Sequence, residues 1–462
     1  MKEKFDLIIK NGNLVLEDKI IMGYIYVKNG KIACISNFNL DVEADETIDA
    51  MGNYVLPGGV DCHSHIWEPT AYDYREDFYT GSCTAASGGI TTMIEMPLSV
   101  PPVTDKESFE NRLKFAEKSI LDYSLWGAFI EDSLDNIEEL DKLGCIGYKG
   151  FLSKASPEYP TADDYVLLKG MKKINMVGSL AGLHAENSII IDGFEKEFKK
   201  KGLNSGKYHE KSRPEINEIE AIQKGLLFSE ETGCRLHICH LSTARAINII
   251  EEAKRKGIKV TVETCPHYLT LTVDDLEAKG GFAKCNPPLR SRDNMEKLWD
   301  LVKEGKIDCI GTDHTIYTDE DRLKYGDDIW SMPPGIGASD LFVPLMVDEG
   351  YNKRNMEMVQ IANLIATNPA KIFGLYPQKG VIQVNADADL IIVDTDEEWV
   401  YEGSKSFSKS KCVNGPFEGR KIKTAVKRVI LRGKTVFNQG KITVDKGGQL
   451  VKPVKKTKGA IS

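Results

Sequence analysis

The middle of the chain alternates short apolar runs with amphipathic stretches, and this alternation constrains the fold more than any other feature. Eight strand-like runs lie between residues 55 and 314: VLPGGVDCHSH, ITTMIEM, YSLWGAFI, CIGYKGFL, LAGLHAEN, RLHICHLS, KVTVETCP and IDCIGTDH. Helix-like stretches such as ESFENRLKFAEKSI and NEIEAIQKGLLFSEE follow most of them. Strands that alternate with helices form parallel sheets. The pattern fits a closed (β/α)₈ barrel or an open doubly wound sheet, and the chemistry of particular residues must decide between them.

Glycine-punctuated segments with alternating hydrophobicity occupy both ends of the chain. FDLIIKNGNLVL and IYVKNGKIACIS come before the alternating middle, and ADLIIVDT and VKRVILRGKTVF come after it. Two β-rich ends that flank a different middle predict one small β-sandwich assembled from both termini. We therefore expect sandwich parts at 1–56 and 379–450, a barrel at 57–378 and a flexible basic tail at 451–462.

Composition argues against several classes of function. The formal net charge is −9, which disfavours a surface for nucleic acid or for an anionic membrane. No apolar run reaches the length of about 18 residues that suggests a membrane span. The ten cysteines are scattered without a C-x-x-C pair, and the start of the chain shows no signal peptide, so we expect a cytoplasmic protein.

The placement of histidines is the second strong signal. Seven of the eight lie at or just after the predicted C-terminal end of a strand: His63, His65, His184, His237, His240, His267 and His314. Only His209 lies elsewhere. The active sites of (β/α)₈ barrels are built at this rim, whereas histidines that only pack would be spread over helices and loops as well. The distribution therefore favours the barrel over the open sheet.

Two short motifs suggest a metal centre. His63 and His65 form an H-x-H at the end of the first strand, where residues i and i+2 point to the same side and can reach one metal. The alternative is a pair of buried, hydrogen-bonded core histidines. Lys149 ends the fourth strand within GYKGF, where a buried cation is costly and a structural role would require an acidic partner. The functional alternative is a neutral amine that takes up CO₂ and becomes a carbamate able to bridge two metals.

Three further strand ends complete the set. His184 and His240 end the fifth and sixth strands and are expected on a second metal. Asp313 ends the eighth strand, where it can bind the first metal and hold a proton. Each residue alone could be structural, but their order on successive strand ends makes chance a poor explanation. We place the remaining rim histidines outside the ligand set: His237, His267 and His314.

Together these motifs resemble the cyclic amidohydrolases, which include allantoinases, hydantoinases, dihydropyrimidinases and dihydroorotases. The resemblance covers nearly the whole chain and rests on PGGVDCHSH, ASGGITTMIEMP, GYKGF, LHAEN, SRPEINEIEAI, HICHLS, TCPHYL, CNPPLR, GTDH and ATNPAKIFGL. It implies an α/β fold, a (β/α)₈ TIM barrel with a small β-sandwich domain. It also implies two divalent metal ions, with Zn²⁺ expected and Mn²⁺, Co²⁺ or Fe²⁺ as alternatives.

The resemblance also implies roles for single residues. The implied ligands are His63, His65 and Asp313 for one ion, His184 and His240 for the other, and carbamylated Lys149 as the bridge. Asp313 would carry a proton to the leaving nitrogen of the substrate. The backbone around Asn286 and Pro334 would lie against the ring amide. The family likeness further suggests a homo-oligomer, a tetramer or a dimer.

Positions that distinguish the branches of this family give mixed signals. MPLSVPPVT, SRPEINEIEAI and GCRLHICHLST resemble allantoinases, whereas TDHTIYTDEDRLKYGDDIWSMPPG resembles hydantoinases. Dihydroorotases carry carboxylate anchors, an arginine after H-x-H and an asparagine after M-P, where this chain has Ile66, Trp67 and Leu98. Typical hydantoinases place a tyrosine five residues after the bridging lysine, and Lys154 occupies that place here. We expect allantoin as the substrate, with hydantoins or dihydropyrimidines as the alternative, and we disfavour dihydroorotate.

A non-catalytic scaffold is the alternative from another class, because fold alone does not fix function. Scaffold members of this fold lack metal ligands. This chain has the expected residue type at all six ligand positions, which favours the enzyme.

Overall fold

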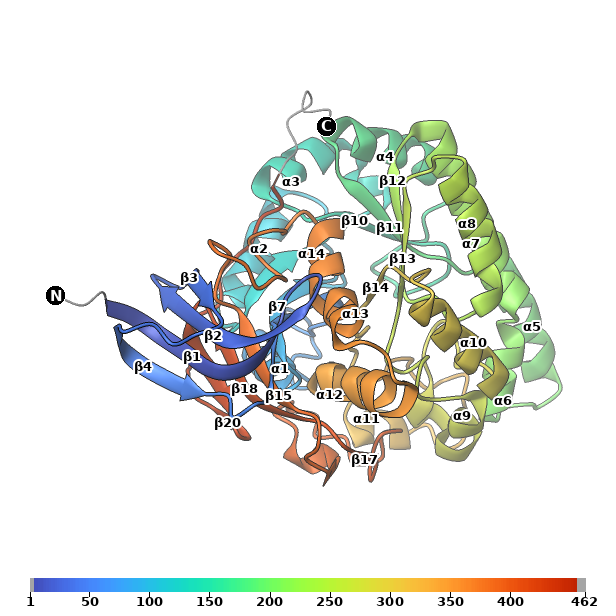
Figure 1. Cartoon of the computed structure of the whole chain (residues 1–462). Helices are drawn as coiled ribbons and strands as arrows, with labels where there is room; N and C mark the ends of the chain where they lie inside the picture. The colour runs from blue at the N-terminus through green and yellow to red at the C-terminus, as the bar shows by residue number, and fades with distance from the viewer. Residues whose placement is uncertain (1–3, 455–462) are drawn as a thin grey trace.

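The computed structural model describes residues 4–454 and shows a barrel beside a β-domain (Figure 1). Apolar runs at the eight predicted positions form parallel strands around the barrel axis. These strands are β6 (Gly59–Ser64), β7 (Ile90–Glu95), β8 (Asp122–Leu125), β9 (Gly127–Ala128), β10 (Tyr148–Phe151), β11 (Leu180–His184), β12 (Arg235–Ile238), β13 (Val260–Thr264) and β14 (Cys309–Ile310). The predicted α/β fold, a (β/α)₈ barrel with a small β-domain, is confirmed.

Closure of the barrel depends on its third and last strands. The third strand is divided at Trp126 into β8, which pairs with β7, and β9, which pairs with β10. A parallel bridge between Ser64 and His314 joins the end of the first strand to the segment after the eighth. This closure excludes the open doubly wound sheet and gathers the C-terminal strand ends around one rim.

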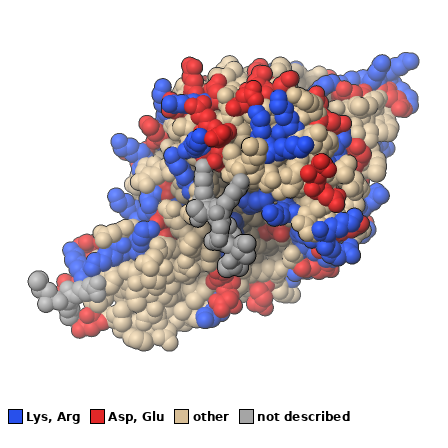
Figure 2. All heavy atoms as spheres, turned by 90° about the horizontal axis from the view of Figure 1, so that it is seen from above, with Lys and Arg blue, Asp and Glu red and all other residues tan. Residues whose placement is uncertain are grey.

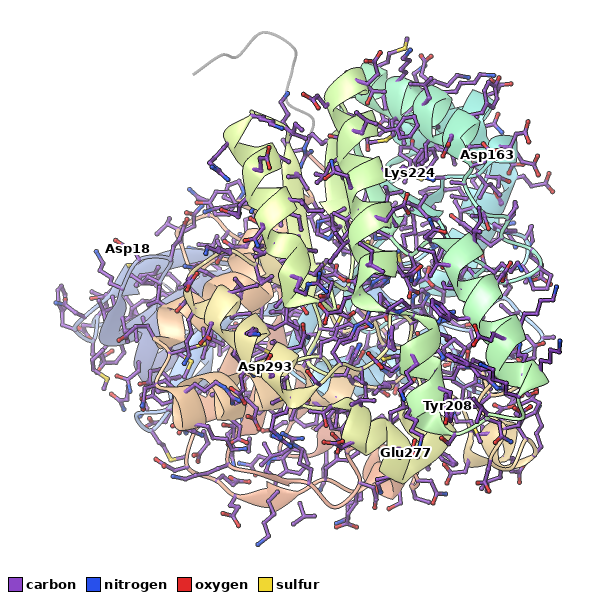
Figure 3. All side chains as sticks on the ribbon, turned by 90° about the vertical axis from the view of Figure 1, so that its right-hand side faces the viewer. Asp18, Asp163, Tyr208, Lys224, Glu277 and Asp293 are labelled. Atoms are coloured by element: carbon purple, nitrogen blue, oxygen red, sulfur yellow. The ribbon has the colours of Figure 1, made fainter. Side chains whose placement is uncertain are left out.

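Helices surround the barrel, and side chains cap the first turn of several of them. Asp77 and Asp105 each accept a hydrogen bond from the backbone N–H three residues later, which satisfies a donor that the helix leaves free. The helices are α1 (Phe78–Ser87), α2 (Lys106–Ala116), α3 (Ile137–Leu143), α4 (Asp164–Val177), α5 (Ser188–Lys200), α6 (Gly206–Ser212), α7 (Glu215–Thr232), α8 (Ile247–Arg255), α9 (Val273–Lys279), α10 (Arg292–Lys303), α11 (Asp319–Leu323), α12 (Phe342–Met346), α13 (Met358–Ala362) and α14 (Asn368–Ile372). Figure 3 shows Tyr208, Lys224, Glu277 and Asp293 on the outer side of α6, α7, α9 and α10.

The β-domain joins the two ends of the chain in one nine-stranded sheet (Figure 1). Its N-terminal strands are β1 (Lys4–Val15), β2 (Ile20–Lys28), β3 (Lys31–Ser36), β4 (Glu43–Asp49) and β5 (Tyr54–Pro57). Its C-terminal strands are β15 (Leu390–Asp394), β18 (Ala425–Leu431), β19 (Lys434–Asn438) and β20 (Lys441–Ile442), and a separate pair is formed by β16 (Trp399–Val400) and β17 (Lys421–Ile422). The two groups meet where β5 and β15 pair antiparallel.

A buried ion-pair network lies where the β-domain meets the barrel. The Lys379 side chain is 0% exposed, and its Nζ lies 2.7 Å from Asp389 Oδ2 and 3.0 Å from Asp387 Oδ2. The same ammonium group binds Asp122 on barrel strand β8, and Asp122 also binds Arg432 of the β-domain. Breaking a buried pair leaves uncompensated charge, so the network holds the two parts of the chain in one relative position.

The surface and the C-terminal segment agree only in part with the sequence expectations. Figure 2 shows acidic and basic side chains interspersed over the barrel on the face in view, without a large basic area there. None of the described helices combines the length and the apolar character needed to cross a bilayer.

Of the expected basic tail, 451–462, only residues 451–454 are described. Val451 is buried and donates its N–H to Tyr123 O, so this part packs on the barrel. Residues 455–462 lie outside the described part.

Candidate metal centre

The rim of the barrel brings His63, His65 and Asp313 into one cluster. Asp313 Oδ1 lies 3.2 Å from His63 Nε2 and 3.2 Å from His65 Nε2. The two histidines come from the end of β6, and the aspartate follows β14, which neighbours β6 when the barrel closes. Two imidazole nitrogens and a carboxylate oxygen thus converge on one point, as the ligands of a divalent cation do.

A second cluster lies beside the first. His184 Nδ1 and His240 Nε2 are 3.1 Å apart, and their ring centroids are separated by 4.7 Å. The centroid of His240 lies 5.1 Å from that of His63, so the two clusters are adjacent. The structure therefore offers two neighbouring sets of metal-ligating atoms at the same rim.

Lys149 lies close to both clusters and has no acidic partner among the described residues. It is 0% exposed, and its positive charge contributes to lowering the pKa values of both His63 and His240. Its Nζ makes no hydrogen bond and no ion pair with any residue in the described range 4–454, and lies 5.1 Å from the centre of the Phe151 ring. The acidic partner that a structural role would require is thus missing from the described part of the chain.

The electrostatic environment favours the protonation states that bind metal. Burial, reinforced by the charge of Lys149, lowers the pKa of His63 to about 4. Burial opposes ionisation of Asp313, but the nearby His63 and His65 outweigh it and lower the pKa of this carboxyl to about 2. Neutral imidazole and ionised carboxylate are the forms in which these side chains coordinate a cation.

Two of the clustered residues have strained backbones. His240 has φ of 38° and Asp313 has φ of 47°, both in the left-handed region that non-glycine residues seldom adopt. Strain of this kind costs of order 1–3 kcal/mol and persists where the surrounding fold imposes it, often at functional sites. The barrel thus holds these two side chains in directions that a relaxed strand end would not give.

Two buried carboxylates form hydrogen bonds with the imidazoles, and neither was predicted from the sequence as a site residue. Glu263 Oε1 lies 2.8 Å from His63 Nδ1, and Glu186 Oε2 lies 2.9 Å from His184 Nε2. Both carboxylates are 0% exposed. A signal was present, since an acidic residue within the apolar run KVTVETCP needs a buried partner, but nothing local identifies that partner.

The other histidines have different surroundings. His314 Nε2 is 2.8 Å from Glu76 Oε2, and its Nδ1 accepts the backbone N–H of Ala338 at 3.1 Å, so both ring nitrogens are occupied away from the clusters. His209 lies on helix α6, outside the rim, and its Nε2 donates to Cys285 O at 3.0 Å. The remaining two are buried: His237 bonds to Thr261 and Glu263, and His267 has no hydrogen-bond partner among the described residues.

A cavity of about 220 Å³ opens above the clusters. His63, His65, His184, His240 and Asp313 line its inner end, and Asn286 and Pro334 line its wall. Apolar and aromatic side chains form much of the remaining wall: Ile66, Trp67, Leu98, Val100, Phe151 and Tyr317. The space suits a small molecule that presents a polar group to the clusters and an apolar group to the wall.

The two cations near this cavity are both neutralised. Lys154 Nζ lies 2.8 Å from Asp192 Oδ2 on α5. Arg75 Nε lies 2.7 Å from Asp321 Oδ2, and the Arg75 guanidinium sits 4.5 Å from the centre of the Trp67 ring. The Arg75 pair is buried, so this charge offers no free anchor for an anionic substrate, whereas the Lys154 pair is exposed and therefore weak.

A closed parallel barrel with imidazoles, a carboxylate and a buried lysine on its C-terminal rim defines the class of barrel hydrolases. Comparison with known proteins agrees. The sequence pattern of the amidohydrolase family matches residues 54–436. An L-hydantoinase from Paenarthrobacter aurescens is 36% identical over 97% of this chain and 98% of the relative, and an allantoinase from Deinococcus radiodurans is 35% identical over 97% and 99%.

Solved structures give the same answer. The structure of an L-hydantoinase (dihydropyrimidinase) from Arthrobacter aurescens superposes with a TM-score of 0.94 at 36% identity and covers 97% of this chain and 100% of that one. The chain belongs to the amidohydrolase family. Within that family it is a hydrolase of cyclic amides, as the sequence motifs predicted.

Proposed function

We propose that the two clusters hold two divalent metal ions. The proposed ligands are His63, His65 and Asp313 for the first ion, His184 and His240 for the second, and a carbamate of Lys149 as the bridge. The buried, unpartnered Nζ of Lys149 supports this assignment, because reaction with CO₂ converts a costly buried cation into an anion between two cations. Nitrogen and oxygen donors suit Zn²⁺, and Mn²⁺, Co²⁺ and Fe²⁺ accept the same set.

The residues of the rim then have distinct tasks in opening a ring amide. When bound, the ions supply an activated water molecule and polarise the carbonyl group. Asp313 accepts a proton from the attacking water and delivers it to the leaving ring nitrogen. Asn286 and Pro334 present backbone groups to the ring amide from the cavity wall.

The geometry supports a five-membered cyclic ureide with an apolar substituent, a 5-substituted hydantoin, as the substrate. The observation that carries this proposal is the cavity wall, which combines the apolar side chains of Trp67, Leu98 and Phe151 with the polar atoms of the two clusters. An apolar substituent gains about 25 cal/mol for each Å² that it buries against such a wall. The L-hydantoinase relative supports the same choice.

Allantoin, the substrate expected from the sequence, is the second candidate. It contains the same five-membered ring, and relatives named allantoinase reach 35–37% identity. Ser99, Ser156 and Thr315 line the cavity and could bind a ureido substituent. Dihydropyrimidines share the ring amide and remain the third choice.

Substrate discrimination tests this proposal. We expect kcat/KM for a 5-substituted hydantoin or for allantoin to exceed that for dihydroorotate by more than about a hundredfold, or about 2.7 kcal/mol. The reason is that a carboxylate loses hydration in the cavity while Lys154 and Arg75 are already paired. Initial rates on these three compounds and on dihydrouracil measure this, and dihydrouracil is the matched control because it differs from dihydroorotate only in lacking the carboxylate. A kcat/KM for dihydroorotate within about a hundredfold of that for the better five-membered substrate would contradict the proposal.

The metal content of the purified protein separates the enzyme from a scaffold. About two ions per chain are expected for the proposed centre, and a protein without metal and without turnover would favour the scaffold. Self-association into a tetramer or dimer is proposed from family likeness alone, and light scattering measures it.

A further inference from the structure

Glu263, at the end of β13, lies under the first cluster and binds four groups at once. Its Oε1 is 2.8 Å from His63 Nδ1 and accepts the backbone N–H of His240 at 3.0 Å. Its Oε2 is 3.1 Å from His237 Nε2 and 3.2 Å from Cys62 Sγ. The carboxylate therefore contacts one proposed ligand of each metal ion, one through the ring and one through the backbone.

None of the four donors to Glu263 is a lysine or an arginine. Glu186, which supports His184, differs because Arg213 and Asn217 also bind it. The negative charge of Glu186 is therefore compensated by a guanidinium, whereas that of Glu263 has no permanent cation bonded to it within the described part of the chain. A buried anion without a counter-charge is costly, so a source of positive charge is required nearby.

The proposed metal centre provides that charge. Two divalent ions bring four positive charges, and Asp313 with a carbamate of Lys149 offsets two of them. Glu263 offsets a third positive charge. Its side chain is fully buried, and the imidazole of His63 separates it from the proposed metal position. Glu263 would therefore raise the affinity of the site for metal ions through its charge, although it contacts neither proposed ion.

The same contact fixes the tautomer of His63. A carboxylate oxygen only accepts hydrogen bonds, so His63 Nδ1 carries the proton when it meets Glu263. The lone pair is then on Nε2, the nitrogen that faces Asp313 at 3.2 Å. Without this acceptor the ring could rotate, or its proton could sit on Nε2 instead of Nδ1, and either change removes the ligand.

We propose that Glu263 is a positioning residue of the metal centre, which holds His63 with Nε2 free for metal and supplies the buried negative charge that balances the ions. This inference rests on the proposed ligand set. The alternative is a purely structural role, in which Glu263 joins His63, His237 and Cys62 inside the barrel without influence on metal binding.

Metal affinity tests the proposal without reference to turnover. In Glu263→Gln the shape is kept but the charge is lost, and the amide can turn a donor toward His63. Protein freed of metal by chelation is titrated with Zn²⁺ against a competing indicator, and the affinity is expected to fall by about 10- to 100-fold. With Co²⁺ the visible absorption spectrum, which reports ligand geometry, is expected to change. Parent affinity together with the parent spectrum would overturn the proposal.

Glu218→Gln is the matched control. Glu218 is also buried and accepts from Ser242 N at 2.8 Å and from Arg290 at 3.2 Å, but it contacts no proposed ligand side chain. Its replacement is expected to leave Zn²⁺ affinity within about twofold of the parent protein. A loss in Glu218→Gln equal to that in Glu263→Gln would assign the effect to general loosening of the barrel and contradict the proposal.

Two further variants keep the outcomes distinct. His63→Ala reports on the ligand set: if it keeps parent affinity, the proposed function fails, whereas loss in His63→Ala with none in Glu263→Gln refutes only the role of Glu263. If Glu263→Gln does not fold, Glu263→Asp decides, because it keeps the charge but shortens the reach to His63 Nδ1. A reduced Zn²⁺ affinity is then expected, and parent affinity in Glu263→Asp would overturn the proposal.

Discussion

Lys149→Ala is expected to lose both the metal pair and turnover. Two unit charges about 4 Å apart repel by about 4 kcal/mol at an effective dielectric of 20, and two divalent ions repel about four times as strongly. The proposed carbamate is the side-chain anion that both ions would share, so its removal leaves much of this repulsion without compensation. Metal analysis of the purified variant and a hydrolysis assay at saturating substrate measure the two losses.

The bridge can be tested further by chemical rescue. The truncation at Lys149 leaves a small buried space, and a short carboxylate such as formate or acetate is expected to restore part of the metal content and activity. Lys142→Ala is the matched control, since Lys142 lies exposed on α3 and pairs with Glu138 at 2.7 Å. Normal metal content and turnover in Lys149→Ala would refute the bridging role.

Asp313→Asn is expected to keep metal and substrate binding while kcat falls by at least about 10²-fold, equivalent to about 2.7 kcal/mol. The amide keeps an oxygen for the cluster with His63 and His65 but cannot accept a proton. Steady-state kinetics with a parallel metal analysis separates loss of proton transfer from loss of metal.

The control for this variant is Asp293→Asn, a change of the same type on the outer side of α10 (Figure 3). It is expected to have the kcat of the parent. An unchanged kcat in Asp313→Asn would mean that another group moves the proton. The next residue to test would be His267, because both ring nitrogens of His314 are already occupied.

Much of this architecture could be predicted because its signals are local. Each barrel strand is a short apolar run bounded by polar residues, and the rim is marked by histidines directly after those runs. The division of the third strand at Trp126 could not be predicted, since YSLWGAFI reads as one continuous strand and only its neighbours β7 and β10 impose the break.

The parts that could not be predicted depend on contacts between distant segments. Glu263 meets His63 across 200 positions of sequence, and Arg75 meets Asp321 across 246. Nothing local in the sequence identifies the carboxylate partners of Arg75 and Lys154. Pairing decides their role, because a neutralised arginine is part of the wall whereas a free one would attract anions.

The sheet shared by both chain ends can be completed only late in translation. Strands β1 to β5 emerge first, but the edge of β5 gains its partner only when Leu390, which pairs with Pro57, has been made. Unpaired strand edges template association between chains, and the whole barrel is translated during this interval. A nascent chain that ends before β15 therefore leaves this edge of β5 without its partner strand.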